Sequence, residues 1–120
     1  MFRSILQTIV EQTPGAQSAF LMGCDGIAVD SFTVSGANAD GGQTVVVEFA
    51  TVVREVAHTA DLLSVGGLEE IAIKCENMTI ILTMLTAEYF VALLIDSSGV
   101  AAKGRYVVRR DAHLLLAALE

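Results

Sequence analysis

The stretch from Thr44 to Ser64 constrains the fold most, because its helical pattern is apolar over more surface than one small sheet can cover. With side chains spaced about 100° apart on a helix, one apolar stripe is predicted: Val45, Phe49, Val52, Val53, Val56, Ala60 and Leu63. Val46, Ala50 and Ala57 lie beside it. An ordinary surface helix has an apolar stripe of roughly 100°, whereas this one spans about 160°. We expect one side to pack on the protein's own sheet and the other to contact a second subunit.

Small side chains on this helix allow a second helix to approach closely, so we place the predicted dimer interface there. The helical residues assigned to it are Val46, Ala50, Val53, Ala57 and Ala60. The valines at the start of the stretch have β propensity, which leaves a local strand as an alternative. Periodicity over the whole stretch favours the helix.

Composition bounds the classes of function. The chain has 120 residues, which predicts one domain over 1–120. Its residues are 53% hydrophobic and only 18% charged, and an excess of apolar surface in a small domain favours oligomerisation. The net charge of −7 makes nucleic acid and anionic membranes poor general partners. No apolar run is long enough to span a bilayer, and Cys24 and Cys75 form no paired motif, so we expect a cytoplasmic protein.

One local exception to the acidic balance lies near the end of the chain. Four of the seven basic residues fall within eight positions, namely Lys103, Arg105, Arg109 and Arg110. This cluster has two interpretations. It is a solvated helix face paired with the acidic remainder of the chain, or it is a docking patch for an acidic protein surface or a nucleotide-bound partner.

The remaining pattern predicts a mixed α+β fold. The expected elements are a helix over 2–10, strands over 16–22 and 27–34, the long helix over 44–64, strands over 68–75, 78–85 and 89–95, and a helix from about 103 to 119. The loop Ser35–Gly42 is expected to be flexible, with Asp40 or Thr44 capping the long helix and Gly66-Gly67 ending it. Connections this short between the last three strands require antiparallel pairing. We therefore expect one five-stranded antiparallel sheet with the long helix on one face and the two terminal helices on the other.

No catalytic constellation is evident, and no cofactor or metal site is predicted. The glycine-rich loop Ser35–Gly42 lacks the lysine and hydroxyl ending of a phosphate-binding loop. His58 and His113 are isolated, so no zinc-type ligand spacing exists. Glu69 and Glu70 are neighbours on a predicted strand and point to opposite faces, so they cannot share one site. We expect a protein without catalytic residues of its own.

The order of elements resembles that of the roadblock/dynein light chain family, whose fold is a profilin-like sandwich. The resemblance rests on Val65-Gly66-Gly67-Leu68-Glu69 after the long helix and on the strand Tyr89-Phe90-Val91-Ala92-Leu93-Leu94. The ending Gly104-Arg105-Tyr106-Val107-Val108-Arg109-Arg110 is similar to bacterial members, which regulate Ras-like GTPases of cell polarity and gliding motility. The resemblance covers essentially the whole chain.

The resemblance implies a homodimer or heterodimer in which long helices pair and the first strand after them joins its symmetry mate. Ile71 and Ile73 on that strand therefore join the predicted interface. It also implies binding of a small GTPase through the paired long helices, with GTP hydrolysis stimulated by positioning the GTPase's own catalytic residues. The exposed edge of the helix is the predicted partner surface: Glu48, Thr51, Arg54, Glu55, His58 and Asp61.

Three alternatives to this prediction remain at the sequence level. The first is a passive dimeric scaffold or motor adaptor without effect on nucleotide turnover. The second is a small-molecule sensor of similar architecture, which requires a pocket with convergent polar groups. The third concerns Arg54, which either forms a solvated or intersubunit pair, with Asp61 nearby on the helix, or contacts the partner directly.

Overall fold

The computed structural model describes all 120 residues and contains every predicted element in the predicted order. The helices are α1 (Phe2–Glu11), α2 (Ala39–Leu62) and α3 (Ala101–Leu119). The strands are β1 (Ala16–Gly23), β2 (Ala28–Thr33), β3 (Glu70–Lys74), β4 (Met78–Met84) and β5 (Tyr89–Asp96).

All five strands form one antiparallel sheet in the order β2-β1-β5-β4-β3. β1 and β2 form a hairpin, β3, β4 and β5 form a meander, and the pairing of β5 with β1 joins the two. The most buried strands, β1 and β5, therefore lie at or next to the centre, and β2 and β3 form the two edges. Between Leu21 and Met22 the register of the β1–β2 pair shifts by a bulge.

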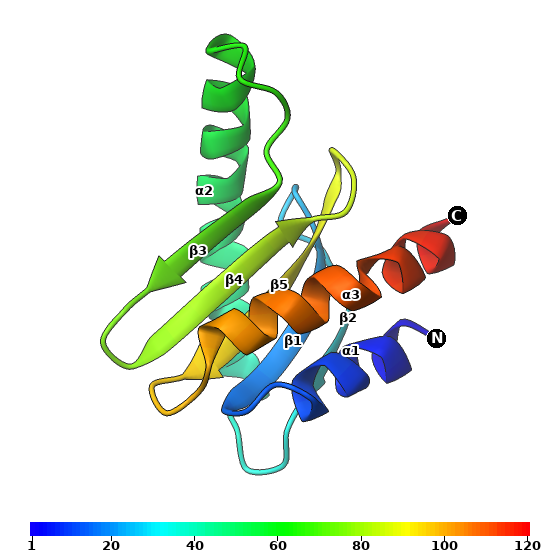
Figure 1. Cartoon of the computed structure of the whole chain (residues 1–120), viewed down its shortest axis with the longest axis vertical. Helices are drawn as coiled ribbons and strands as arrows, with labels where there is room; N and C mark the ends of the chain where they lie inside the picture. Colours follow the sequence, from blue (N-terminus) through cyan, green and yellow to red (C-terminus); the bar gives the residue numbers. More distant parts are fainter.

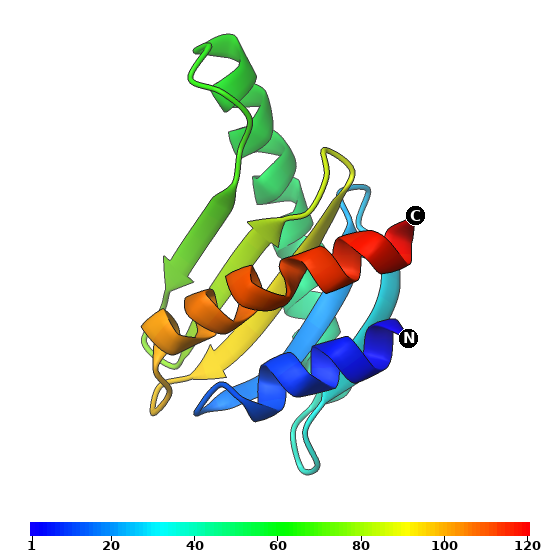
Figure 2. The same ribbon diagram turned by 45° about the vertical axis from the view of Figure 1, so that its right-hand side comes forward.

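Helices cover both faces of the sheet, as Figures 1 and 2 show. α1 and α3 lie side by side over one face, and α2 crosses the other. Each face has its own buried cluster, because successive strand residues point to opposite sides. Leu21, Val91 and Leu93 pack toward α1 and α3, and Phe20 and Phe90 pack toward α2. The predicted fold class is confirmed.

The start of α2 differs from the prediction. The helix begins at Ala39 and not at Thr44, so half of the expected flexible loop is helical. Neither Asp40 nor Thr44 caps it: the side-chain oxygen of Asn38 accepts a hydrogen bond from the Gly41 backbone N–H at 2.9 Å. The valines at 45–47 are helical. Val46 is buried in the cluster against the sheet and Val45 packs beside it, so tertiary contacts override the local β propensity.

α3 packs closely on the sheet at Gly104. A Cβ atom there would lie 2.8 Å from Ile95 Cδ1 and 3.0 Å from Leu93 Cδ2. Both of these side chains are buried in the cluster between β5 and α3, so they have little room to move. The glycine therefore sets how close the helix lies to the central strands.

We predict that Gly104→Leu lowers the free energy of unfolding by about 2 kcal/mol, because overpacking a filled core costs about 1–3 kcal/mol. Gly67→Leu is the control, since nothing lies within 4 Å of a Cβ added at Gly67. Urea unfolding followed by circular dichroism measures both. Equal stability of the two variants would contradict close packing at Gly104.

Candidate functional site

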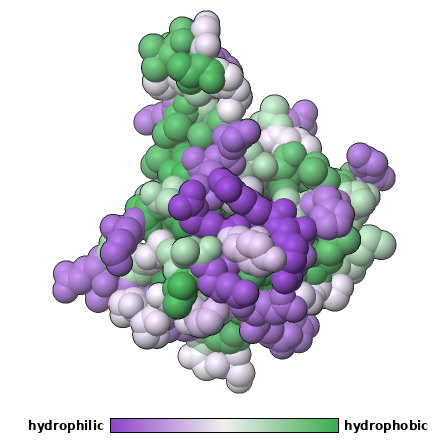
Figure 3. All heavy atoms as spheres, viewed as in Figure 1, coloured by the Kyte–Doolittle hydropathy of each residue, from purple (hydrophilic) through white to green (hydrophobic).

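The C-terminal turns of α2 project beyond the sheet. Figures 1 and 2 show this end of the helix standing clear of the other elements. Leu62, Leu63 and Val65, which we call the α2 tip, are 70%, 66% and 73% exposed. Figure 3 shows hydrophobic atoms gathered on the projecting end. An exposed apolar cluster of this kind marks an interaction surface.

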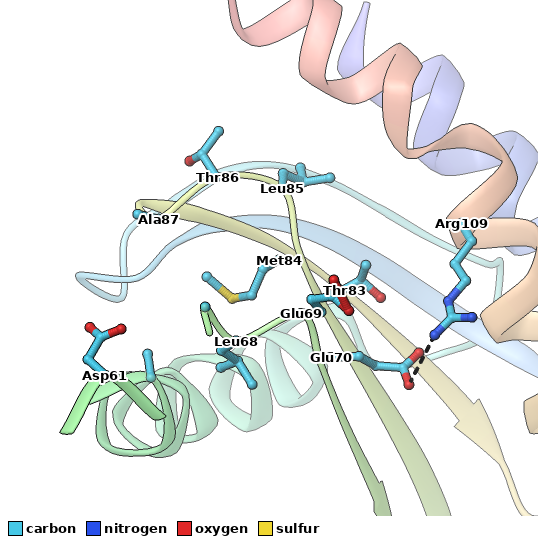
Figure 4. Close-up of a pocket in the computed structure, with 12 residues that line it drawn as sticks. Asp61, Leu68, Glu69, Glu70, Thr83, Met84, Leu85, Thr86, Ala87 and Arg109 are labelled. Atoms are coloured by element: carbon cyan, nitrogen blue, oxygen red, sulfur yellow. Dashed lines mark ion pairs between the residues drawn. The ribbon is translucent and has the colours of Figure 1, made fainter. Parts of the chain in front are cut away.

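A cavity of about 650 Å³ lies between the projecting part of α2, the start of β3 and the β4–β5 turn. In Figure 4, Asp61 lies at the α2 side of the cavity, the pair of Glu70 and Arg109 lies at the other, and Leu68 and Met84 lie between them. The cavity lining contains no serine, cysteine, histidine or lysine. Its hydroxyl groups come from Thr83 and Thr86, and its carboxylates from Asp61, Glu69 and Glu70.

The structure places three residues of the predicted dimer interface in the core of the single chain. Val46 and Ala50 are fully buried and Val53 is 1% exposed, all within the cluster between α2 and the sheet. We assign these three to the intrachain core, because no surface of theirs is open to a second copy. The physical reason is that the small side chains bring α2 close to its own sheet. Ala57 and Ala60, further along the helix, are half-buried.

A second apolar stripe, beside the buried side of α2, is only partly covered by the chain. Val45, Phe49, Val52 and Val56, which we call the lateral stripe, are half-buried or exposed, and Val56 is 37% exposed. Arg54 on the opposite side of the helix donates a hydrogen bond to the backbone oxygen of Cys24, directly after β1. The lateral stripe therefore faces the β3 side of the sheet.

β3 is a sheet edge with no neighbour on one side. Ile71 and Ile73 pack against the α2-side cluster and are half-buried. Glu70, Ala72 and Lys74 point to the α3 side. An unpaired strand presents free N–H and C=O groups that another strand can bind.

The structure brings the six predicted partner residues together on the exposed surface of α2. Glu48, Thr51, Arg54, Glu55, His58 and Asp61 are all exposed. The Nη2 group of Arg54 donates to Thr51 Oγ1 at 3.2 Å, and Arg54 forms no ion pair with Asp61. The guanidinium is thus held against its own chain by neutral acceptors.

The ion pairs of the structure all involve α3. Arg105 contacts the Glu70 carboxylate with two hydrogen bonds, of 3.1 Å from Nε and 2.6 Å from Nη2. Arg109 Nη2 lies 3.9 Å from the same carboxylate. Arg110 donates to both carboxylate oxygens of Asp111 at 2.9 Å. These hydrogen bonds hold the pKa of Asp111 below its usual range, and the Glu70 carboxylate raises the pKa of Arg105.

The other candidate residues from the sequence are not brought together into a further site. Burial raises the pKa of the Cys24 thiol, although Arg54 acts in the opposite direction, so the thiol is not an activated nucleophile. No group of three metal-binding side chains is gathered in the structure. No helix is long and apolar enough to cross a membrane.

Two features were missed by reasoning from the sequence. The α2 tip was not singled out, although an apolar pair and Val65 directly before Gly66-Gly67 were a usable signal. The contact between Glu70 and Arg105 joins residues 35 positions apart. No local pattern could have indicated it.

Comparison with known proteins decides the family. No protein-family model and no curated protein matches the sequence. A Roadblock/LC7 domain from Streptomyces avermitilis has the same fold, with a TM-score of 0.73 and 14% identity over 94% of this chain and 96% of that one. MglC from Myxococcus xanthus is 30% identical over 98% of both chains, with a TM-score of 0.75. The chain belongs to the roadblock/LC7 family.

The gliding protein MglB from Thermus thermophilus shares the fold of this roadblock/LC7 protein, with a TM-score of 0.83. Its identity is 18%, over 94% of this chain and 84% of that one. This family assignment confirms the resemblance seen in the sequence.

We predict that Asp111→Asn changes how the stability of this roadblock/LC7 protein depends on pH. The folded pKa of Asp111 is depressed, so its carboxylate stabilises the fold above the unfolded value of about 3.9. That contribution is lost as the pH falls through the folded pKa. The variant should be less stable by about 1 kcal/mol at pH 7 and should lose less stability below about pH 4. Thermal unfolding from pH 7 to pH 2 measures this, and parallel curves for both proteins would contradict it.

Proposed function

We propose that this chain is a homodimeric regulator that binds a small Ras-like GTPase. The observation that carries the proposal is the lateral stripe of α2, an apolar surface that its own chain covers only in part and that lies beside the unpaired edge of β3. One of these adjacent surfaces is apolar, and the other is made of free backbone groups. A single partner can cover the first and form hydrogen bonds with the second. A second copy related by a two-fold axis presents the same two surfaces in return.

The sequence of β3 is complementary to itself in antiparallel pairing. Residues opposite each other in such a pair point to the same face of the sheet, so Ile71 must meet another inward residue. Pairing Ala72 with the partner subunit's Ala72 places Ile71 opposite the partner subunit's Ile73. It also places Glu70 opposite the partner subunit's Lys74, and opposite charges at such positions favour pairing. Shifting the centre of the pairing by one residue loses this charge match.

The α2 tip supports the same arrangement. Leu62, Leu63 and Val65 project past their own sheet, and in a two-fold dimer a projecting helix end reaches over the neighbouring copy. The Ala57 and Ala60 side chains then lie at the junction between the two helices. The proposed interface therefore keeps four of the predicted residues, Ala57, Ala60, Ile71 and Ile73. In it the lateral stripe replaces Val46, Ala50 and Val53.

The GTPase surface is proposed on the polar side of α2. Its six residues are exposed on the polar side of the helix, and Arg54 among them lies opposite the lateral stripe. The bacterial roadblock proteins that the sequence resembles regulate Ras-like GTPases, and the gliding protein MglB has the same fold. Because Arg54 is bound to the Cys24 oxygen and to Thr51, the proposed action is to position the GTPase's own catalytic residues. In this proposal the protein does not donate an arginine to the nucleotide.

We predict that Val56→Glu dissociates the dimer and that Val47→Glu does not. Both valines are 37% exposed on the same helix, but they lie about half a turn apart around its axis. A charge at Val56 would be buried against the second copy without a partner. Size exclusion with light scattering measures the mass against the 12.7 kDa of one chain. A Val56→Glu protein that keeps twice this mass would contradict the proposed interface.

We predict that Arg54→Glu weakens binding of a GTP-loaded Ras-like GTPase from the same organism at least tenfold. The dimer mass should stay unchanged, because Arg54 lies on the side of α2 away from the lateral stripe. Arg3→Glu makes the same charge change on α1 and serves as the control. Calorimetric titration measures affinity, and phosphate release measures hydrolysis. Unchanged affinity would refute the assigned surface, and binding without faster hydrolysis would leave the protein an adaptor.

A further inference from the structure

The cationic cluster near the end of the chain forms a continuous surface on α3. Lys103, Arg105, Tyr106, Arg109 and Arg110, which we call the α3 basic surface, lie within two helical turns. A shallow groove of about 550 Å³ runs among the last four of them and Ala102. Figure 3 shows hydrophilic side chains gathered over α3, on the face opposite to α2. The GTPase surface proposed above therefore does not include it.

The carboxylates that pair with these cations lie beneath them. The side chains of Glu70 and Asp111 are only 14% and 10% exposed, whereas those of Arg105, Arg109 and Arg110 are 45%, 65% and 38% exposed. Positive charge therefore faces solvent, and the negative charge is covered by the protein. The surface has four cations for two carboxylates, in a chain whose net charge is −7.

The covered carboxylates also fix the cations in place. Arg105 is held by two hydrogen bonds to Glu70, and Arg110 is held by Asp111 and by the side-chain oxygen of Gln12. Groups that are already ordered lose less entropy when a partner binds. Arg109 has no hydrogen bond of its own, only the 3.9 Å approach to Glu70, so its guanidinium is free to pair with an incoming carboxylate.

We propose that the α3 basic surface binds an acidic segment of a partner protein. From Lys103 to Arg110 the helix rises roughly 10 Å, which about three residues of an extended peptide span. Carboxylates spaced along such a segment can reach Arg109 and Lys103 together. Tyr106, 57% exposed in the middle of the surface, offers its ring to an apolar side chain between them. The Lys103 ammonium lies 5.2 Å from the centre of that ring.

A peptide fits this surface better than a polyanion or a bilayer does. A nucleic acid or an anionic membrane would extend past the surface and meet the acidic remainder of the chain, which repels it. The surface also has only one large apolar side chain to insert into lipid, that of Tyr106. A short acidic segment avoids both costs.

The test measures binding of a fluorescein-labelled oligoglutamate peptide of about eight residues by fluorescence anisotropy at low salt. We expect saturable binding that weakens as salt is added. Arg109→Glu should weaken it at least tenfold, whereas Arg3→Glu, the same charge change on α1, should leave it unchanged. Because a glutamate beside Glu70 also threatens folding, Arg109→Ala and Lys103→Ala are measured too, and each should weaken binding severalfold with an unaltered circular dichroism spectrum.

Three results would overturn the proposal. The first is the absence of saturable binding to the wild-type protein. The second is equal weakening by Arg3→Glu and Arg109→Glu, which would indicate general charge attraction. The third is binding of phosphatidylserine vesicles or of a single-stranded oligonucleotide that oligoglutamate does not displace. GTPase binding measured on the same variants should be unchanged, so failure of this proposal is distinguishable from failure of the proposed function.

Discussion

The contact between the small-residue side of α2 and the sheet determines most of what this molecule presents to others. Ala50 and Val53 bring the helix close to the β-strands, and Gly42 lets its first turn approach Phe20, whose ring would lie 3.3 Å from an added Cβ. A helix that lies this close can bury only a narrow part of its circumference. The lateral stripe consequently lies at the side, next to the free edge of β3, and the far end of the helix extends past the sheet.

The two faces of the sheet differ in which charged side chains are exposed. On the α2 face the exposed side chains are mixed in sign, with Arg54 bound to neutral oxygens of its own chain. On the α3 face carboxylates are covered and guanidiniums are displayed. The proposed GTPase and the proposed acidic segment would therefore approach opposite sides of one small sheet. A protein that holds two partners in this way would combine the regulator and scaffold functions between which the sequence left the choice open.

Element type, strand pairing and the covering of each face could all be predicted from the sequence, because each depends on local periodicity or on short connections. The direction in which α2 faces could not. Its helical pattern shows two adjacent apolar stripes, and periodicity does not say which of them meets the sheet. That choice depends on how closely the backbones approach, and here the small residues that suggested a helix pair instead allow contact with the chain's own strands. The predicted partner residues are exposed, because the periodicity of polar residues directly indicates which side of a helix faces solvent. The contact of Arg105 with Glu70, by contrast, depends on the tertiary arrangement alone.

The unequal edges of the sheet limit how far the proposed assembly can grow. The β3 edge pairs with β4 without a register shift and alternates in character, whereas the opposite edge, β2, pairs with β1 through a bulge. A bulge discourages the addition of a further strand. Joining two β3 edges about a two-fold axis uses up the only regular edge of each copy and leaves a bulged strand at either end. The resulting object is a closed pair, and the same topology that favours one partner strand protects the chain against open-ended fibre formation.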